Sequence, residues 1–133
     1  MAKLLVAGGL YEKDETGPLR RRFAEALGRQ TILRGHTLLG GCRTQLDLVV
    51  AQAASAAAQS RKLDPNKMIH SWVTRSTTPI HKFGEITRSQ LGDWSEVPRG
   101  FAFPEPVREC DAMIIIGDRK STRLNSSHSY RSR

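Results

Sequence analysis

The chain contains few cysteines, few aromatic residues and no long apolar run. Its 133 residues include 2 cysteines, Cys42 and Cys110, and 6% aromatic residues. Two cysteines cannot form the disulfide framework of a small secreted domain, and their spacing matches no zinc motif. No segment approaches the roughly 18 apolar residues of a membrane-spanning helix, and the N-terminus lacks the features of a signal peptide. We therefore expect one cytoplasmic domain with reduced thiols and without a metal site, a cofactor or a membrane partner.

Acidic residues are also scarce, with 13 against 21 basic residues and a net charge of +8. Residues 118–133 hold five basic residues and one acidic residue, which is half of this excess. The other half is scattered over residues 1–117, apart from Arg20, Arg21 and Arg22 near the start of an expected helix. A scattered charge does not predict a nucleic-acid-binding surface, so nucleic acid is not the expected partner.

The last sixteen residues, DRKSTRLNSSHSYRSR, show no apolar periodicity and predict a disordered tail. Within it, residues 118–128 resemble the translation of a sequencing-library adapter. We therefore expect an artefactual tail at residues 118–133, joined to an open reading frame that is interrupted at about Gly117. The alternative is a natural basic, Ser-rich tail that binds nucleic acid.

Apolar runs typical of buried strands alternate with helical patterns along residues 1–117. Strands are expected at residues 3–7, 36–41, 68–73 and 112–117. Helices are expected at residues 18–33, from just after Gly41 to about Lys62, and at residues 106–111. The polar residues 74–104 are expected to form a partly ordered segment at the active face or to contain a short helix near residues 86–91.

The two long helices have recognisable faces. In the first, the spacing of Phe23, Ala26 and Leu27 predicts the side that faces the core, and Gly35 is the expected C-terminal glycine. In the second, Leu46 and Val49 begin a stripe that continues through alanines, which predicts a flat face packed closely on a sheet. Together the elements predict an α/β fold class, a Rossmann-like three-layer fold with a parallel sheet, incomplete at the C-terminus.

Glycine pairs end two of the expected strands, Gly8-Gly9 and Gly40-Gly41. The second pair leads into a helix, whose first N–H groups lack partners and whose dipole is positive at that end. Such a turn binds phosphate, and the carboxyl ends of parallel strands meet at one edge of the sheet. The residues expected to bind a ligand are Gly8, Gly9, Gly40, Gly41, Cys42, Arg43, Thr44 and Asp47. A tight turn without a ligand is the alternative for each pair.

Asp47 lies on the same side of the expected helix as Thr44. It is expected either to accept ribose hydroxyls or to interact only with the helix dipole. Cys42 at a helix N-terminus is expected to have a lowered pKa, although no histidine is placed by the sequence to activate it. Trp72 is expected in the core. No residue is assigned to catalysis, and the exposed candidates in the polar segment are Glu85 and Asp93.

The segments LLVAGG, GHTLLGGCRTQLDLVVAQAA and CDAMIIIG, with the helices between them, resemble the SLOG superfamily of Rossmann-like nucleotide-binding proteins. Its enzyme members are the LONELY GUY-type phosphoribohydrolases, once labelled lysine decarboxylases. The resemblance covers most of residues 1–117 and is most specific over residues 35–54. It implies a nucleotide or nucleotide-derived ligand, and it leaves open whether a longer parent protein forms a homo-oligomer.

In those enzymes, the strand matching residues 111–117 leads into a proline-glycine-glycine, glycine-threonine and glutamate motif that binds the ribose phosphate and supplies the catalytic acid. Adapter-like sequence follows Gly117 instead. Of the arginine-lysine pair that precedes that strand in the enzymes, only Arg108 is present. The resemblance therefore favours a binding or sensor protein. The alternative is a nucleoside 5′-monophosphate phosphoribohydrolase, or a deoxyribosyltransferase-type enzyme that cleaves an N-glycosidic bond.

Overall fold

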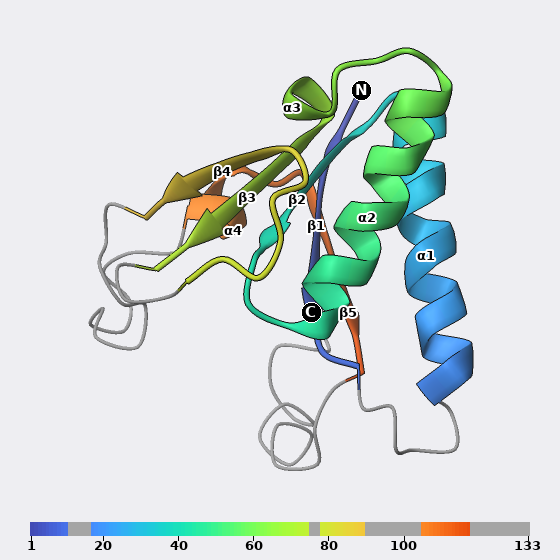
Figure 1. The fold of residues 1–133 in the computed structure, drawn as a ribbon. Coiled ribbons are helices and arrows are strands. Elements are labelled where there is room, and N and C mark those ends of the chain that lie inside the picture. The colour runs from blue at the N-terminus through green and yellow to red at the C-terminus, as the bar shows by residue number, and fades with distance from the viewer. Residues whose placement is uncertain (11–16, 75–77, 90–104, 118–133) are drawn as a thin grey trace.

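The computed structural model describes residues 1–10, 17–74, 78–89 and 105–117. They form an α/β fold in which helices cover both faces of one sheet of five parallel strands (Figure 1). The strands are β1 (Lys3–Gly8), β2 (Thr37–Gly41), β3 (Ile69–Val73), β4 (Glu85–Arg88) and β5 (Ala112–Ile116). The helices are α1 (Gly17–Leu33), α2 (Gln45–Ser60), α3 (Pro65–Met68) and α4 (Glu105–Glu109).

The strand order is β4-β3-β2-β1-β5, and each neighbouring pair is parallel. The chain therefore builds the sheet outward from β1 to β4 and then returns to add β5 on the other side of β1. This return reverses the direction of strand addition between β1 and β5, which is where Rossmann-like sheets form their ligand crevice. The expected Rossmann-like α/β class with a parallel sheet is confirmed.

One face of the sheet is covered by α1 and α2, which lie side by side in Figure 1. Leu46, Val49 and Val50 of α2 pack with strand residues such as Leu38 and Ile69 in the larger apolar core. Alanines at positions 51, 54, 57 and 58 are also buried there. Their small side chains let the helix approach the sheet closely, as the sequence stripe predicted.

The opposite face carries a smaller core of Leu5, Leu39 and Trp72, against which Val107 of α4 packs. Because side chains alternate along a strand, residues on this face are those that α1 and α2 cannot reach. α4 has only five residues and covers little of β5. Met113 and Ile115 of β5, on this same face, are consequently 44% and 56% exposed.

For residues 74–104 a partly ordered active-face segment was the favoured prediction, and the alternative of a short helix near residues 86–91 is wrong because residues 85–88 form β4. This strand pairs with β3 in the register His70↔Glu85 to Val73↔Arg88. Ile86 and Thr87 favour extended backbone once the edge of β3 is available. Four residues are too few for an alternating pattern to be recognised, and the sequence therefore predicted four strands instead of five. Residues 90–104, also part of the expected active-face segment, lie outside the described residues.

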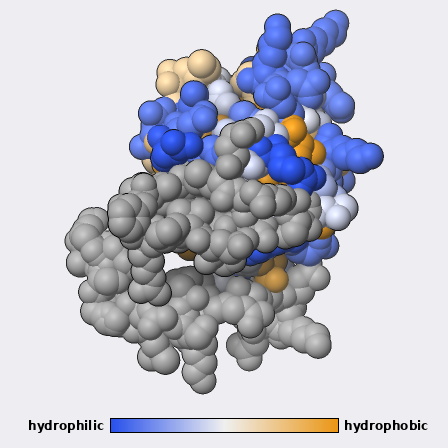
Figure 2. All heavy atoms as spheres, turned by 90° about the vertical axis from the view of Figure 1, so that its left-hand side faces the viewer, coloured by the Kyte–Doolittle hydropathy of each residue, from blue (hydrophilic) through white to orange (hydrophobic). Residues whose placement is uncertain are grey.

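β4 is one edge of the described sheet and has charged residues at both ends, Glu85 and Arg88. Figure 2 views the molecule from this side and shows hydrophilic residues over much of the coloured surface. Charged edge strands resist pairing with other chains. Within the described ranges, no helix is long and apolar enough to cross a membrane.

The face of α1 also differs from the expectation, because Phe23 is 53% exposed. The buried residues of this helix are Gly17, Ala24, Gly28, Thr31 and Ile32. α1 contacts α2 through small residues, which brings the helices together and turns the bulky Phe23 outward. The ends of α1 agree with the prediction to one residue, and Gly35 follows in a left-handed conformation at φ 81°. α2 ends at Ser60, two residues before the expected Lys62.

We predict that Gly28→Ala destabilises the fold. A Cβ at this position would overlap with the backbone carbonyl oxygen of Val50 in α2. Forcing the helices apart costs about 1–3 kcal/mol, which exceeds the gain of up to about 1 kcal/mol in helix propensity. Urea denaturation measures the free energy of unfolding. Gly40→Ala is the control, since its Cβ would meet only the carbonyl oxygen of Val6 at 3.9 Å. Equal stability of the two variants would contradict the prediction.

Candidate functional site

A pocket of about 290 Å³ lies at the carboxyl ends of β1, β2 and β3. Its walls are mainly buried apolar side chains, including Leu5, Trp72 and Val73, and α4 closes one side with Pro106 and Val107. Its exposed lining residues are Gly8, Arg43 and Met113. Among the described residues, the lining consists of Leu5, Val6, Ala7, Gly8, Gly41, Cys42, Arg43, Thr44, Asp47, Trp72, Val73, Thr74, Pro106, Val107 and Met113.

The turn from β2 into α2 forms the polar part of this pocket. Thr44 is the N-cap of α2, and its hydroxyl accepts a hydrogen bond from the Asp47 N–H at 3.2 Å. The Asp47 carboxylate reaches back, and its Oδ2 accepts from the N–H groups of Thr44 and Arg43, each at 3.0 Å. This reciprocal pattern is a capping box, which fixes the start of a helix. It keeps the turn folded tightly against Gly41.

The glycine pairs are only partly brought to the pocket. Gly8 and Gly41 line it, whereas Gly9 and Gly40 are not among its lining residues. Gly8 has φ 117°, and a Cβ there would overlap with the carbonyl oxygen of Ile116, so this close approach of β1 to β5 requires glycine. The N–H of Gly9 donates to the same carbonyl oxygen at 3.0 Å, which ties the end of β1 to β5.

Cys42 does not have the properties that the sequence suggested. It lies two residues before the N-cap and is 1% exposed. Burial raises the pKa of the Cys42 thiol, and the nearby Asp47 carboxylate adds to this rise. The thiol donates to the carbonyl oxygen of His81 at 3.2 Å. The expectation of a lowered pKa is therefore wrong, because the thiol faces the protein interior.

Residues 78–84 contact the turn from β2 into α2 through hydrogen bonds to Cys42. The N–H of Ile80 donates to the Cys42 carbonyl oxygen at 3.0 Å. His81 is 5% exposed, and its Nδ1 accepts from the Phe83 N–H at 3.1 Å. Its Nε2 is buried with no hydrogen-bond partner among the described residues. Burial lowers the pKa of His81, although the Asp47 carboxylate opposes part of this shift. A neutral imidazole is thus built into the support of the turn.

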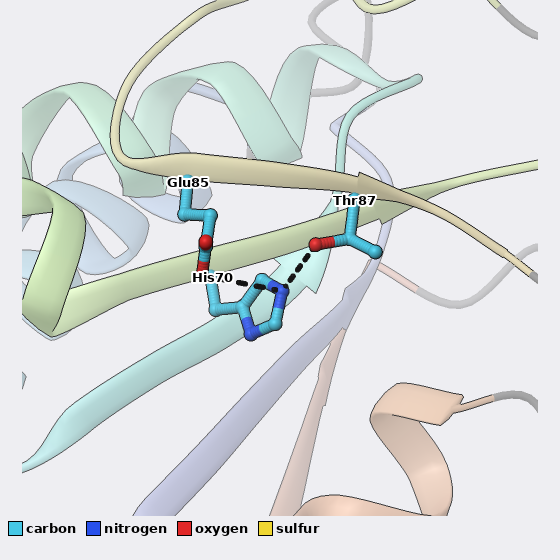
Figure 3. Close-up of polar contacts among 3 residues, drawn as sticks. All are labelled: His70, Glu85 and Thr87. Carbon is cyan, nitrogen blue, oxygen red and sulfur yellow. Dashed lines mark hydrogen bonds and ion pairs between the residues drawn. The ribbon is translucent and has the colours of Figure 1, made fainter.

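Glu85 and Arg108, the expected catalytic candidates that the structure describes, do not line the pocket. Glu85 starts β4, where its Oε1 lies 3.8 Å from Nε2 of His70 (Figure 3). The same nitrogen lies 2.7 Å from the hydroxyl oxygen of Thr87, and the His70 ring stacks on Trp72 with centroids 3.8 Å apart. Arg108 is exposed on α4 and absent from the lining. Asp93 lies outside the described residues.

Sequence reasoning missed the apolar half of the pocket. Trp72 was expected in the core, and it is 3% exposed, but it also forms a wall of the pocket. Pro106, Val107 and Met113 join from the far end of the chain. The short helix expected before the last strand could have indicated them. A right-handed crossover from β4 back to the far side of β1 must place this helix on the face opposite α1 and α2. Among the described residues, no three His, Cys, Asp or Glu side chains are grouped to hold a metal ion.

We predict that the Cys42 thiol is protected in the native state. A Cys110→Ser variant, which retains Cys42, should react with a thiol reagent at pH 8 at least about a hundredfold more slowly in buffer than in denaturing urea, because reaction requires local opening. The matched variant Cys42→Ser retains the partly exposed Cys110 and should show a much smaller difference. Equal protection ratios in the two variants would rule out the buried thiol.

The buried His81 should make stability sensitive to acid. Its folded-state pKa is below the ordinary value of about 6.5, so the unfolded chain takes up the proton first. The free energy of unfolding is fully retained above about pH 6.5 and decreases as the pH falls towards the folded-state pKa. His81→Asn, which keeps an acceptor near the Phe83 N–H, should reduce this slope in urea denaturation between pH 7 and pH 5. Parallel slopes for both proteins would contradict the assignment.

Comparison with solved structures shows a likeness to TM1055, a target of the Northeast Structural Genomics Consortium solved by X-ray crystallography. The TM-score is 0.66 at 17% sequence identity, and the match covers 99% of this chain and 70% of TM1055. No family model matches the chain, and no curated protein matches its sequence. At this level of identity the likeness shows the fold alone, and it fits a Rossmann-like α/β arrangement.

Proposed function

We propose that the chain binds a nucleotide or nucleotide-derived ligand in the pocket at the carboxyl ends of β1–β3. The observation that carries this proposal is the joining of two chemically different halves in one cavity. Apolar walls from the buried Leu5 and Trp72 and the partly buried Val107 face a polar turn that contains Arg43 and Asp47. A nucleotide has the same division, because its base is planar and weakly polar while its sugar and phosphate are strongly polar.

The apolar half suits a planar heterocycle. It lies between the sheet surface and α4, and the Trp72 ring, held in place by the stacked His70, is part of its wall. Aromatic and aliphatic walls with few polar groups are typical of small-molecule sites. The position agrees with the general rule that open parallel sheets bind ligands beyond the carboxyl ends of their strands, near the reversal between β1 and β5.

The resemblance of residues 35–54 to SLOG proteins adds support for a nucleotide-related ligand and for a sensor role. A catalytic role in N-glycosidic bond cleavage needs a carboxylate near the anomeric carbon. Among the described residues, the candidate carboxylate of Glu85 does not line the pocket, and Asp47 uses one carboxylate oxygen to hold the turn. We therefore propose binding without turnover for this chain, and incubation with AMP should release no free adenine.

Titration calorimetry with AMP, NAD and ADP-ribose tests the proposal, and at least one of them should bind. Met113→Trp places a large ring at the exposed side of the pocket and should weaken that binding at least about tenfold, or 1.4 kcal/mol. Ile115→Trp is the matched control, because Ile115 lies on the same strand and face but does not line the pocket.

Binding of none of the three compounds would contradict the proposal. So would equal effects of the two tryptophan variants, since the ligand would then bind elsewhere. Release of free base from AMP by the wild-type chain, and its loss in Met113→Trp, would replace the sensor role with the enzymatic alternative.

A further inference from the structure

The sequence suggested that the turn from β2 into α2 binds phosphate, but its N–H groups already bind the carboxylate of Asp47. Oδ2 of Asp47 accepts from the N–H groups of both Arg43 and Thr44 at 3.0 Å. These are the donors that a phosphate at the start of α2 would use first. The same carboxylate also neutralises the positive end of the helix dipole. A phosphate placed there would lose two donors and meet a negative charge.

Asp47 is also too tightly fitted to move aside easily. A Cβ added at Gly41 would lie 3.1 Å from its Oδ2, so the backbone of β2 passes close to the carboxylate. The Asp47 N–H is bound in turn by the Thr44 hydroxyl. An external anion could replace the carboxylate only if both of its hydrogen bonds, from the N–H groups of Arg43 and Thr44, were broken. The geometry therefore disfavours phosphate at this turn.

The pocket also contains a positively charged side chain, Arg43, in addition to the negatively charged Asp47. Arg43 is exposed and lines the pocket, and no hydrogen bond or ion pair of its guanidinium group with the described residues is found. A guanidinium group binds phosphate oxygens through paired N–H donors. The site thus offers an acceptor inside the turn and a cation at the exposed side of the pocket.

We infer that the pocket recognises the nucleoside end of its ligand, with ribose hydroxyls donating to Asp47 and any phosphate held outside the turn by Arg43. This inference rests on the proposed function. The pocket volume of about 290 Å³ is at the lower end of the range for small-molecule sites, which fits one nucleoside better than a dinucleotide. Asp47 both folds the turn and selects the sugar.

Affinities of adenosine, 2′,3′-dideoxyadenosine and AMP for wild type, Asp47→Asn and Arg43→Met test this inference. Wild type should bind adenosine at least about fivefold more tightly than the dideoxy compound, as expected for a hydroxyl bonded to a carboxylate. Asp47→Asn keeps one acceptor for the turn and should lose most of that preference. Arg43→Met should retain it and lose instead the salt-sensitive gain of AMP over adenosine.

Asp64→Asn is the matched control for the loss of a capping carboxylate, because Asp64 caps α3 through the Asn66 N–H and does not line the pocket. It should leave all three affinities unchanged.

Each comparison is a ratio of affinities within one variant, so a partly unfolded sample does not alter it. The inference is overturned if Asp47→Asn keeps the sugar preference, or if it strengthens AMP relative to adenosine about tenfold or more. If neither nucleoside nor AMP binds wild type while NAD or ADP-ribose does, this inference fails and the proposed function stands; if none of these compounds binds, the proposed function itself fails.

Discussion

The capping box at the start of α2 is the contact on which the site depends. Asp47 and Thr44 exchange hydrogen bonds across the first turn of the helix, and Asp47 also binds the N–H of Arg43. These bonds turn the chain sharply where β2 ends. They set the direction in which α2 leaves the sheet, and so place Leu46, Val49 and Val50 in the main core. The same turn forms the polar side of the pocket.

The two faces of the sheet have different roles because they are covered to different extents. α1 and α2 bury one face of the sheet in a continuous apolar core, which includes Ala24 of α1 and Ile116 of β5. The short α4 covers the other face only in part, over Leu5, Leu39 and Trp72. A pocket forms where this cover ends near the carboxyl edge, with Val107 on one side and the turn on the other. The fold thus has one closely packed layer and one layer that contains a pocket.

Much of the fold follows from local patterns in the sequence. The apolar runs at β1 and β5 and the alanine-rich stripe of α2 predict their elements directly, because one residue period dominates each segment. β4 could not be found in this way, since its four residues become a strand only through pairing with β3. The outward position of Phe23 depends on the close contact of α1 with α2 at Gly28, which helical periodicity alone does not specify.

The candidate site was predictable in position but not in chemistry. Glycines at strand ends located Gly8 and Gly41, because parallel strands share one carboxyl edge. The inward orientation of the Cys42 thiol depends on the carbonyl oxygen of His81, which is 39 residues away in the chain. The apolar wall from α4 depends likewise on a crossover over the far face of the sheet. The contact of Cys42 with His81 leaves no local signal, whereas the face that α4 covers follows from the handedness of the crossover once the strand order is known.

The central claim is that a nucleotide-related ligand occupies the pocket between the turn and α4. An AMP titration of ¹⁵N-labelled chain followed by NMR tests it most directly, with the backbone amides and the Trp72 indole as probes. We expect saturable chemical-shift changes at Gly8, Gly41, Trp72 and Val107. The N–H groups of Arg43 and Thr44 should remain hydrogen-bonded to Asp47, so their resonances should change little. Shifts confined to other surfaces, or none at millimolar AMP, would contradict it.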